Sequence, residues 1–69
     1  MEFNYSKLRG RIKEICGTEG EFAKSINRTP NYISRVFGNK TEFSQTDIAS
    51  ASDVLGIEIN DIGQYFFMQ

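Results

Sequence analysis

Side chains that carry nucleophilic or metal chemistry are scarce in this sequence. Cys16 is the single cysteine, and the chain contains no histidine. A thiol needs a neighbouring base to act as a nucleophile, and carboxylates without a glycine-marked loop make a poor metal cage. We therefore interpret Cys16 as a small core residue. The sequence predicts no enzyme activity, no metal or other cofactor, and no small-molecule substrate.

Charged side chains are unevenly distributed and could act on an anionic partner. Residues 1–40 hold all eight basic side chains beside four acidic ones, a net charge of +4. Residues 41–69 hold five acidic side chains and no basic one, a net charge of −5. This asymmetry indicates one face that meets phosphate and another that faces solvent or a partner. Ordinary solvated charge is the alternative interpretation.

The length and composition set the scale of the fold. Two hydrophobic cores could not each bury enough surface in 69 residues, so we expect residues 1–69 to form one domain. Six Phe and three Tyr can fill one small core without disulfides or metal. No segment approaches the ~20 apolar residues of a membrane span, and no leader-like apolar run opens the chain. We therefore expect a cytoplasmic protein with no membrane partner.

The first half of the chain predicts two helices with clear boundaries. The first has Asn4 as its expected N-cap and ends at Gly17. The second begins at Thr18, which forms a capping-box pattern with Glu21. Helical spacing assigns to their buried faces Tyr5, Leu8, Ile12, Ile15 and Cys16 in the first and Phe22, Ala23 and Ile26 in the second.

A short turn and a third helix follow. Asn27 readily accepts the left-handed backbone that ends one helix and turns into the next. Thr29 suits the N-cap of the new helix and Pro30 its first position, where the missing N–H costs nothing. The helix is expected to stop at Gly38-Asn39, with Ile33, Val36 and Phe37 on its apolar face.

The remaining sequence predicts a fourth helix and a last short one. Ser44 and Asp47 resemble a capping box, and the fourth helix runs to Leu55 before Gly56. Its inner face is expected to contain Ile48, Ala51, Val54 and Leu55. The last helix is expected over residues 60–64, with Ile59 and Ile62 packed inward and Tyr65, Phe66 and Phe67 sealing the core. The predicted fold class is all-α.

The order of these motifs resembles the helix-turn-helix of lambda-repressor-like and Cro-like regulators. The resemblance covers about residues 5–62 and rests on Thr-x-x-Glu-Phe-Ala-Lys, Thr-Pro-Asn-Tyr-Ile-Ser-Arg and Gly-Asn-Lys at these spacings. The opening Asn-Tyr-Ser-Lys-Leu-Arg-Gly-Arg-Ile and the closing Ile-Gly-Gln-Tyr-Phe-Phe are similar to short Cro-like proteins of temperate phages from Gram-positive hosts. Some of those are called modulators of repression. The resemblance implies a compact five-helix domain whose second and third helices form the helix-turn-helix.

The resemblance also implies a site for double-stranded operator DNA. Residues 30–37 would form the recognition helix in the major groove, where Asn31 matches the edge of adenine and Arg35 that of guanine. One short helix contacts few base pairs, so a homodimer is the expected binding form. The expected DNA-binding residues are Arg28, Thr29, Asn31, Tyr32, Ser34, Arg35, Lys40 and Thr41.

Four positions depart from the family pattern, and one of them is Asn27, which replaces the turn glycine and is tolerated by the backbone. Glu19 stands where the family usually has a Gln that contacts phosphate, so its carboxylate would oppose DNA. Arg28 replaces an apolar residue after the turn, which removes a core contact and leaves a cation that could reach phosphate. Pro30 can offer a base only apolar contact, such as with a thymine methyl group.

An antirepressor is the alternative function, as the resemblance to modulators of repression implies. Such a protein would bind a cognate phage repressor and block its DNA-binding surface. Glu19, Glu21 and the acidic second half would attract the repressor's basic face, with Tyr32 and Phe43 as apolar anchors. Plain core packing is the simpler interpretation of Phe43.

Overall fold

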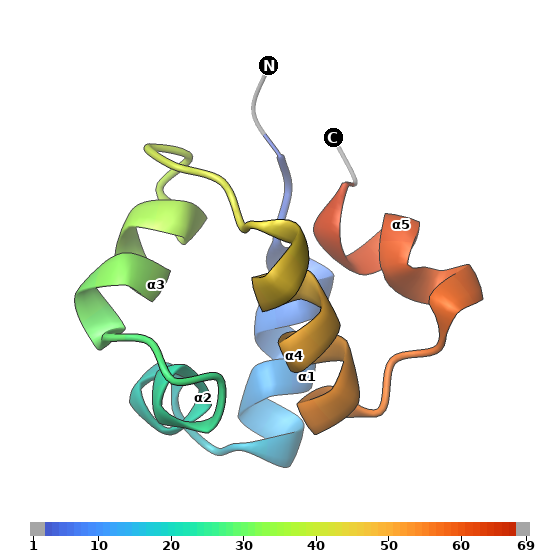
Figure 1. Ribbon diagram of the computed structural model, residues 1–69, viewed down its shortest axis with the longest axis horizontal. Helices are drawn as coiled ribbons and strands as arrows, with labels where there is room; N and C mark the ends of the chain where they lie inside the picture. The colour runs from blue at the N-terminus through green and yellow to red at the C-terminus, as the bar shows by residue number, and fades with distance from the viewer. Residues whose placement is uncertain (1–2, 68–69) are drawn as a thin grey trace.

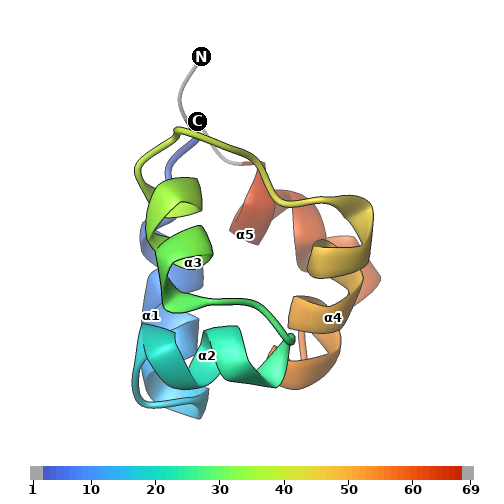
Figure 2. The same ribbon diagram turned by 60° about the vertical axis from the view of Figure 1, so that its left-hand side comes forward.

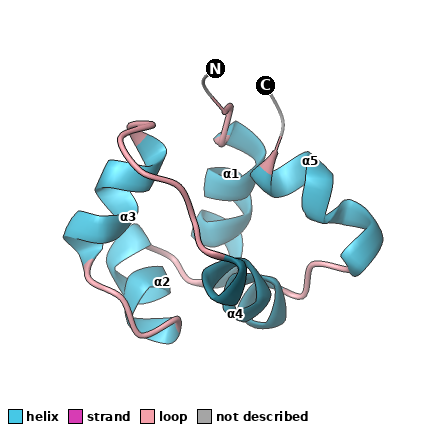
Figure 3. Cartoon of the chain, turned by 45° about the horizontal axis from the view of Figure 1, so that its top comes forward, coloured by secondary structure: helices cyan, strands magenta, loops and turns pink. Residues whose placement is uncertain are grey.

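A computed structural model describes residues 3–67 of the chain (Figure 1). In this part of the chain every regular element is helical, as Figure 3 shows by colour. The elements are α1 (Ser6–Ile15), α2 (Glu19–Ser25), α3 (Pro30–Phe37), α4 (Gln45–Leu55), the single 3-10 turn η1 (Ile59–Asp61) and α5 (Ile62–Phe66). The predicted all-α, five-helix architecture is therefore confirmed.

The helices are arranged around α1 and α4, which lie in the middle of the molecule (Figure 1). Helices α2 and α3 lie on one side of this central pair, and η1 and α5 lie on the other. Turning the molecule shows that α2 and α3 lie at a steep angle to each other and are joined by a short connection (Figure 2). The two described ends meet, because the rings of Phe3 and Phe67 have centroids 6.0 Å apart.

All five α-helices contribute to one hydrophobic core. Leu8, Phe22, Ile33 and Val36 are fully buried, and Phe66 is 2% exposed. Burial of each such side chain contributes about 1.5–3 kcal/mol. The other buried apolar residues are Tyr5, Ile12, Ala23, Ile26, Ala51 and Leu55. The aromatic C-terminal segment thus closes the core through Phe66, as expected from the sequence.

Side-chain caps fix where three of the helices begin. The Thr18 hydroxyl accepts a hydrogen bond from the Glu21 amide at 3.1 Å, and Thr29 accepts one from Tyr32 at 3.2 Å. Ser44 and Asp47 form a complete capping box, with each side chain accepting from the other's amide. Each cap satisfies an amide that the helix leaves unpaired, which stabilises the helix by about 1 kcal/mol.

Left-handed residues end the helices as the sequence predicts. Asn27 has φ of 60° between α2 and α3, and Gly56 has φ of 65° after α4. At Asn27 a side chain is tolerated because Asn is among the residues that adopt this conformation most readily. The Thr29-Pro30 start of α3 and its end at Phe37 are also confirmed.

Several local predictions are wrong. Asn4 is not the N-cap of α1; Tyr5 is, and the Asn4 side chain instead accepts from the Ser6 amide at 2.9 Å. Ile15 is 49% exposed because it ends α1. Cys16 is half-buried and packs against the core, so its assignment to the core is confirmed in part. Ile59 is 85% exposed because it opens the 3-10 turn, where the helical spacing used to place it inward does not apply.

The last helix, α5, starts later in the chain than the sequence predicts. Helix α5 begins at Ile62 and continues to Phe66, so the helix expected over residues 60–64 is displaced towards the C-terminus by η1. Ile62 is half-buried against the core, as expected. Within residues 3–67, no helix is long and apolar enough to cross a membrane.

Candidate nucleic-acid interface

Helix α3 separates a buried apolar face from an exposed polar face. Ile33 and Val36 are completely buried beneath the helix. Asn31, Ser34 and Arg35 are exposed on the opposite side. Because residues three and four positions apart share a helix face, these three polar side chains lie together. Thr29 is exposed at the start of the same helix, where its hydroxyl serves as the cap.

The cations around α3 differ in whether they have a partner. Arg35 and Lys40 are exposed, and neither takes part in an ion pair within residues 3–67. Lys40 and the half-buried Thr41 follow the carboxyl end of α3, at the other end of the helix from Thr29. The expected DNA-binding residues therefore extend along the length of α3.

Arg28 and Tyr32 are joined to a buried carboxylate instead of projecting freely. Arg28 Nε donates to Asp47 Oδ1 at 2.8 Å, and the Tyr32 hydroxyl donates to Asp47 Oδ2 at 2.7 Å. The Arg28 guanidinium also lies over the Tyr32 ring, 4.7 Å from its centroid. Asp47 belongs to α4 and its side chain is 4% exposed. This Arg28–Tyr32–Asp47 network fastens the α2–α3 connection to α4.

The network shifts the ionisation of each of its members. Burial alone would raise the pKa of Asp47, but hydrogen bonds from Arg28, Tyr32 and Ser44 outweigh burial and lower the pKa. Burial and the hydrogen bond to Asp47 both raise the pKa of Tyr32. The hydrogen bond to Asp47 raises the pKa of Arg28. Asp47 therefore stays an anion that holds Arg28 and Tyr32 in place.

The role of Asp47 was missed by the sequence analysis, which used it only as a capping-box residue. The available signal was the cation at position 28, where the lambda-repressor-like pattern described above implies an apolar residue. A buried carboxylate such as that of Asp47 needs a cationic or hydrogen-bonding partner. Arg28 fills its position by pairing with Asp47, 19 residues away, so the missing core contact is replaced by a polar one.

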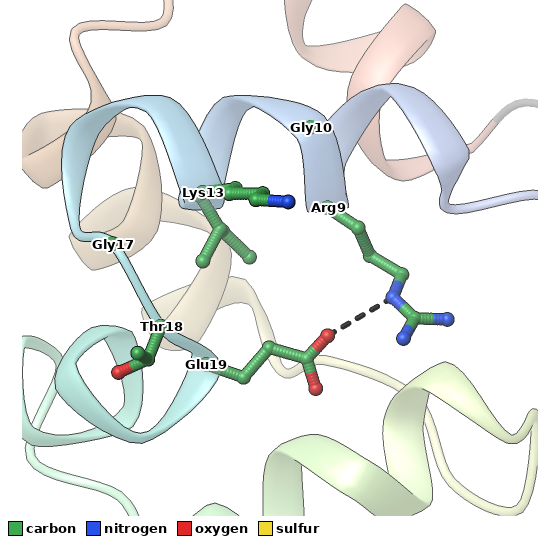
Figure 4. A pocket seen from close by; sticks show the side chains of 7 residues that line it. Arg9, Gly10, Lys13, Gly17, Thr18 and Glu19 are labelled. Carbon is green, nitrogen blue, oxygen red and sulfur yellow. Dashed lines mark hydrogen bonds and ion pairs between the residues drawn. The ribbon is translucent and has the colours of Figure 1, made fainter.

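Glu19, the carboxylate expected to oppose DNA, is paired with a cation. Its Oε2 lies 3.0 Å from Arg9 Nε, and Figure 4 shows the two side chains pointing toward each other across a shallow pocket between α1 and the start of α2. Both side chains remain accessible, at 38% for Glu19 and 55% for Arg9. The pair is therefore screened by water and weak.

Phe43 lies at the centre of an aromatic cluster and is not a free anchor. Its ring centroid is 5.6 Å from that of Phe66, 6.1 Å from Tyr5 and 6.2 Å from Phe37. Tyr32 joins the edge of this cluster, 6.3 Å from Phe43. Both aromatic side chains named as antirepressor anchors are thus engaged inside the protein.

The amino-terminal segment is fastened beside the end of α3. The Phe3 amide donates to Asn39 Oδ1 at 2.8 Å, and Asn39 Nδ2 donates to the Phe3 carbonyl at 3.1 Å. Asn39 can present its amide in this way because it has left-handed backbone, with φ of 59°. The end of α3 is therefore held in place by a residue 36 positions earlier.

The architecture defines the class of protein: a compact all-α domain of five helices, similar to a phage regulatory protein rather than to an enzyme family. A solved structure titled "modulator of repression (MOR) of the temperate bacteriophage TP901-1 from Lactococcus lactis" matches with a TM-score of 0.83 and 34% sequence identity. The match covers 97% of this chain and 90% of the other. The resemblance to phage modulators of repression, stated from the sequence, is confirmed.

The particular family follows from the sequence match. Residues 1–69 match the family described as "Protein of unknown function (DUF739)", and the chain belongs to it. No curated protein sequence matches the chain.

Proposed function

We propose that this protein is a regulator of phage repression that binds operator DNA through α3. The observation that carries the proposal is the exposed face formed by Asn31, Ser34 and Arg35 on a helix whose opposite face is buried. Asn and Arg are the side chains that pair bidentately with adenine and guanine in the major groove.

Helices α2 and α3 act in this proposal as a helix-turn-helix. They cross closely, with the fully buried Ala23 and Phe22 of α2 packed in the core together with Ile33 of α3. The Asn27 turn and the Thr29 cap supply the sharp connection that such a motif needs. Lys40 and Thr41 would contact the phosphate backbone, and two copies would bind two half-sites of an operator.

Arg28 and Tyr32 have a positioning role in this function. Their hydrogen bonds to Asp47 fix the entry of α3 relative to α4. Arg28 remains 42% exposed, so its guanidinium can approach a phosphate while Nε stays bonded to Asp47.

A DNA titration with matched variants tests the proposal. We expect Arg35→Ala to weaken binding to the neighbouring intergenic DNA by about 1–3 kcal/mol at fixed salt, with an unchanged melting temperature. Lys13→Ala, an exposed cation on α1, is the control and should change affinity far less. Equal affinities of the two folded variants, or no preference of the protein for that DNA, would contradict the proposal.

The antirepressor is the second candidate, favoured by the similarity to a phage protein named a modulator of repression. In this function the protein would bind a cognate repressor and block its DNA-binding surface. The acidic residues after position 40 would attract a basic repressor face. Titration against the co-encoded repressor, alone and with its operator present, separates the candidates, because an antirepressor releases the repressor from DNA without binding that DNA itself.

A further inference from the structure

A wide apolar groove lies on the side of the molecule away from α3. One wall is a face of α4 that includes Ile48, Ala49 and Ser52. The other wall comes from the segment after α4, with Ile57 and Ile62 as its half-buried members. The groove has a volume of about 710 Å³ and is open along its length. Helices α4 and α5 both contribute lining residues, and Figure 1 shows α4 near the middle of the molecule with α5 to its right.

Two of the three large apolar side chains that are exposed within residues 3–67 line the groove. Ile59 is 85% exposed and Phe67 is 52% exposed, and both line the groove. An isoleucine left almost entirely in water contributes nothing to folding stability. Adjacent exposed apolar side chains beside a hollow are typical of an interaction surface.

One polar side chain beside the groove, Ser52, has no hydrogen-bond partner. It lines the groove, is 8% exposed, and its hydroxyl is the one buried side-chain oxygen or nitrogen within residues 3–67 that lacks a hydrogen-bond partner. A buried hydroxyl without a partner is destabilising. Because the Ser52 Oγ is itself closed to solvent, a polar group in the groove could bond to it only after the side chain rotates toward the groove.

The charges along the groove are acidic. Asp53 and Glu58 line it, and no basic side chain does. Arg11, which reaches the end of α4, is already occupied: its Nε donates to the Leu55 carbonyl at 3.0 Å and its Nη1 lies 3.1 Å from Glu14. An occupant of the groove would therefore meet negative charge.

These features decide between kinds of occupant. A small molecule is usually enclosed by its pocket, whereas this groove is open. In a symmetric dimer formed through the groove, the groove of one copy would face the groove of the other, because a two-fold interface uses the same patch twice. The acidic residues of the two copies would then repel each other. A helix with an apolar stripe flanked by Lys or Arg satisfies both the apolar walls and the acidic rim.

We propose that the groove between α4 and the η1–α5 segment binds a basic amphipathic helix of a partner protein. The apolar stripe would cover Ile59 and Phe67, and the basic flanks would lie against Asp53 and Glu58. The proposal does not depend on DNA binding by α3, because the groove is formed by other residues. Each can fail while the other holds.

The test titrates the full chain with a designed peptide. The probe is a helix of about 18 residues with leucine at i, i+3, i+4 and i+7 spacing and lysine on both flanks. We expect saturable binding below about 0.1 mM, with amide NMR shifts concentrated in residues 45–67. The matched peptide with glutamate in place of lysine should bind at least about tenfold more weakly.

Paired variants locate the binding site. Ile59→Ser should weaken binding of the lysine peptide by about tenfold, whereas Ile15→Ser, an exposed isoleucine on α1 outside the groove, should change it by less than about twofold. Glu58→Gln should lower affinity and its salt dependence, and Glu21→Gln, an exposed acid on α2, should not. Because all four of these residues are exposed, we expect each variant to fold.

Four results would overturn the proposal. They are equal losses in the two isoleucine variants, equal binding of the lysine and glutamate peptides, absence of saturation, and NMR shifts centred on α2 and α3. Sedimentation of the protein alone checks the other occupant. A concentration-dependent dimer that Ile59→Ser abolishes would assign the groove to a second copy of the chain and would also overturn the proposal.

Discussion

The two faces of α4 show how one helix serves two different surfaces. On the side of α3, Asp47 is buried and fully paired with Arg28 and Tyr32. On the side of α5, Asp53 is exposed beside apolar walls. The first face holds polar groups inside the protein, and the second leaves apolar groups outside it. The α3 side is therefore positioned by the fold itself, whereas the α5 side has apolar side chains that only an occupant would cover.

The first prediction compares the stability lost when a phenylalanine is truncated on the α3 side and on the α5 side of the molecule. Phe22→Ala should lower the free energy of unfolding by about 3–5 kcal/mol, because it opens a cavity where α2 and α3 meet. Phe67→Ala, at a site that is 52% exposed, should cost less than about 1 kcal/mol. Urea denaturation measures both. Similar losses in the two variants would show that the sides are equally well packed and would remove the contrast.

The second prediction compares the two aspartates of α4. Asp47→Asn should destabilise the protein by about 1–3 kcal/mol at pH 7, because Arg28 and Tyr32 lose their anionic acceptor. The value is below that of a fully buried pair because the Arg28 side chain is 42% exposed. Asp53→Asn should change stability by less than about 0.5 kcal/mol.

The same pair of variants predicts a pH dependence with a definite sign. The folded-state pKa of Asp47 lies below the ordinary value of 3.8, so its stabilisation is complete above that value and is lost as pH falls through the folded-state pKa. The stability difference between the wild type and Asp47→Asn should therefore be constant from pH 7 to about 5 and shrink below about 4. A difference that persists undiminished in strong acid would contradict the role of the ionised carboxylate.

The smallest effect concerns Glu19, whose sign separates the two candidate functions. Glu19→Gln removes a negative charge near α3 and frees Arg9, so DNA binding at low salt should tighten by a few fold, equivalent to about 0.2–1 kcal/mol. A complex with a basic repressor surface should instead weaken, chiefly through slower association. Glu14→Gln, which also frees an arginine but on the other side of α1, is the control. No change in either affinity would make Glu19 a solvated cap residue with no functional role.

Local signals predicted most helix boundaries correctly because the causes are local. The Thr29-Pro30 start, the Asn27 turn and the Ser44–Asp47 capping box each depend on neighbours within three residues. Predictions of which side chains are buried failed where burial depends on packing between distant parts of the chain. Ile59 fits a helical spacing, but its side chain lies outside the core because α5 begins later than the spacing implies.

The candidate interface could be predicted only in part for the same reason. The exposure of Asn31 and Arg35 follows from the period of α3 and is seen in the structure. The pairing of Arg28 with Asp47 spans 19 residues and joins two helices, so no local pattern contains it. The groove likewise depends on how α4 and α5 pack together, and its exposed Ile59 and Phe67 had both been assigned to the core.

The meeting of Phe3 and Phe67 means that the start and end of the folded part lie side by side. A linker between two copies fused in tandem would therefore leave and enter each domain at the same place, and its length would be set by the half-site spacing of about 34–36 Å. A flexible linker that spans this distance holds the second copy at an effective concentration of up to about millimolar. Such a fusion would occupy a two-half-site operator as one molecule, so its gain in affinity over the single domain measures how weakly separate copies associate.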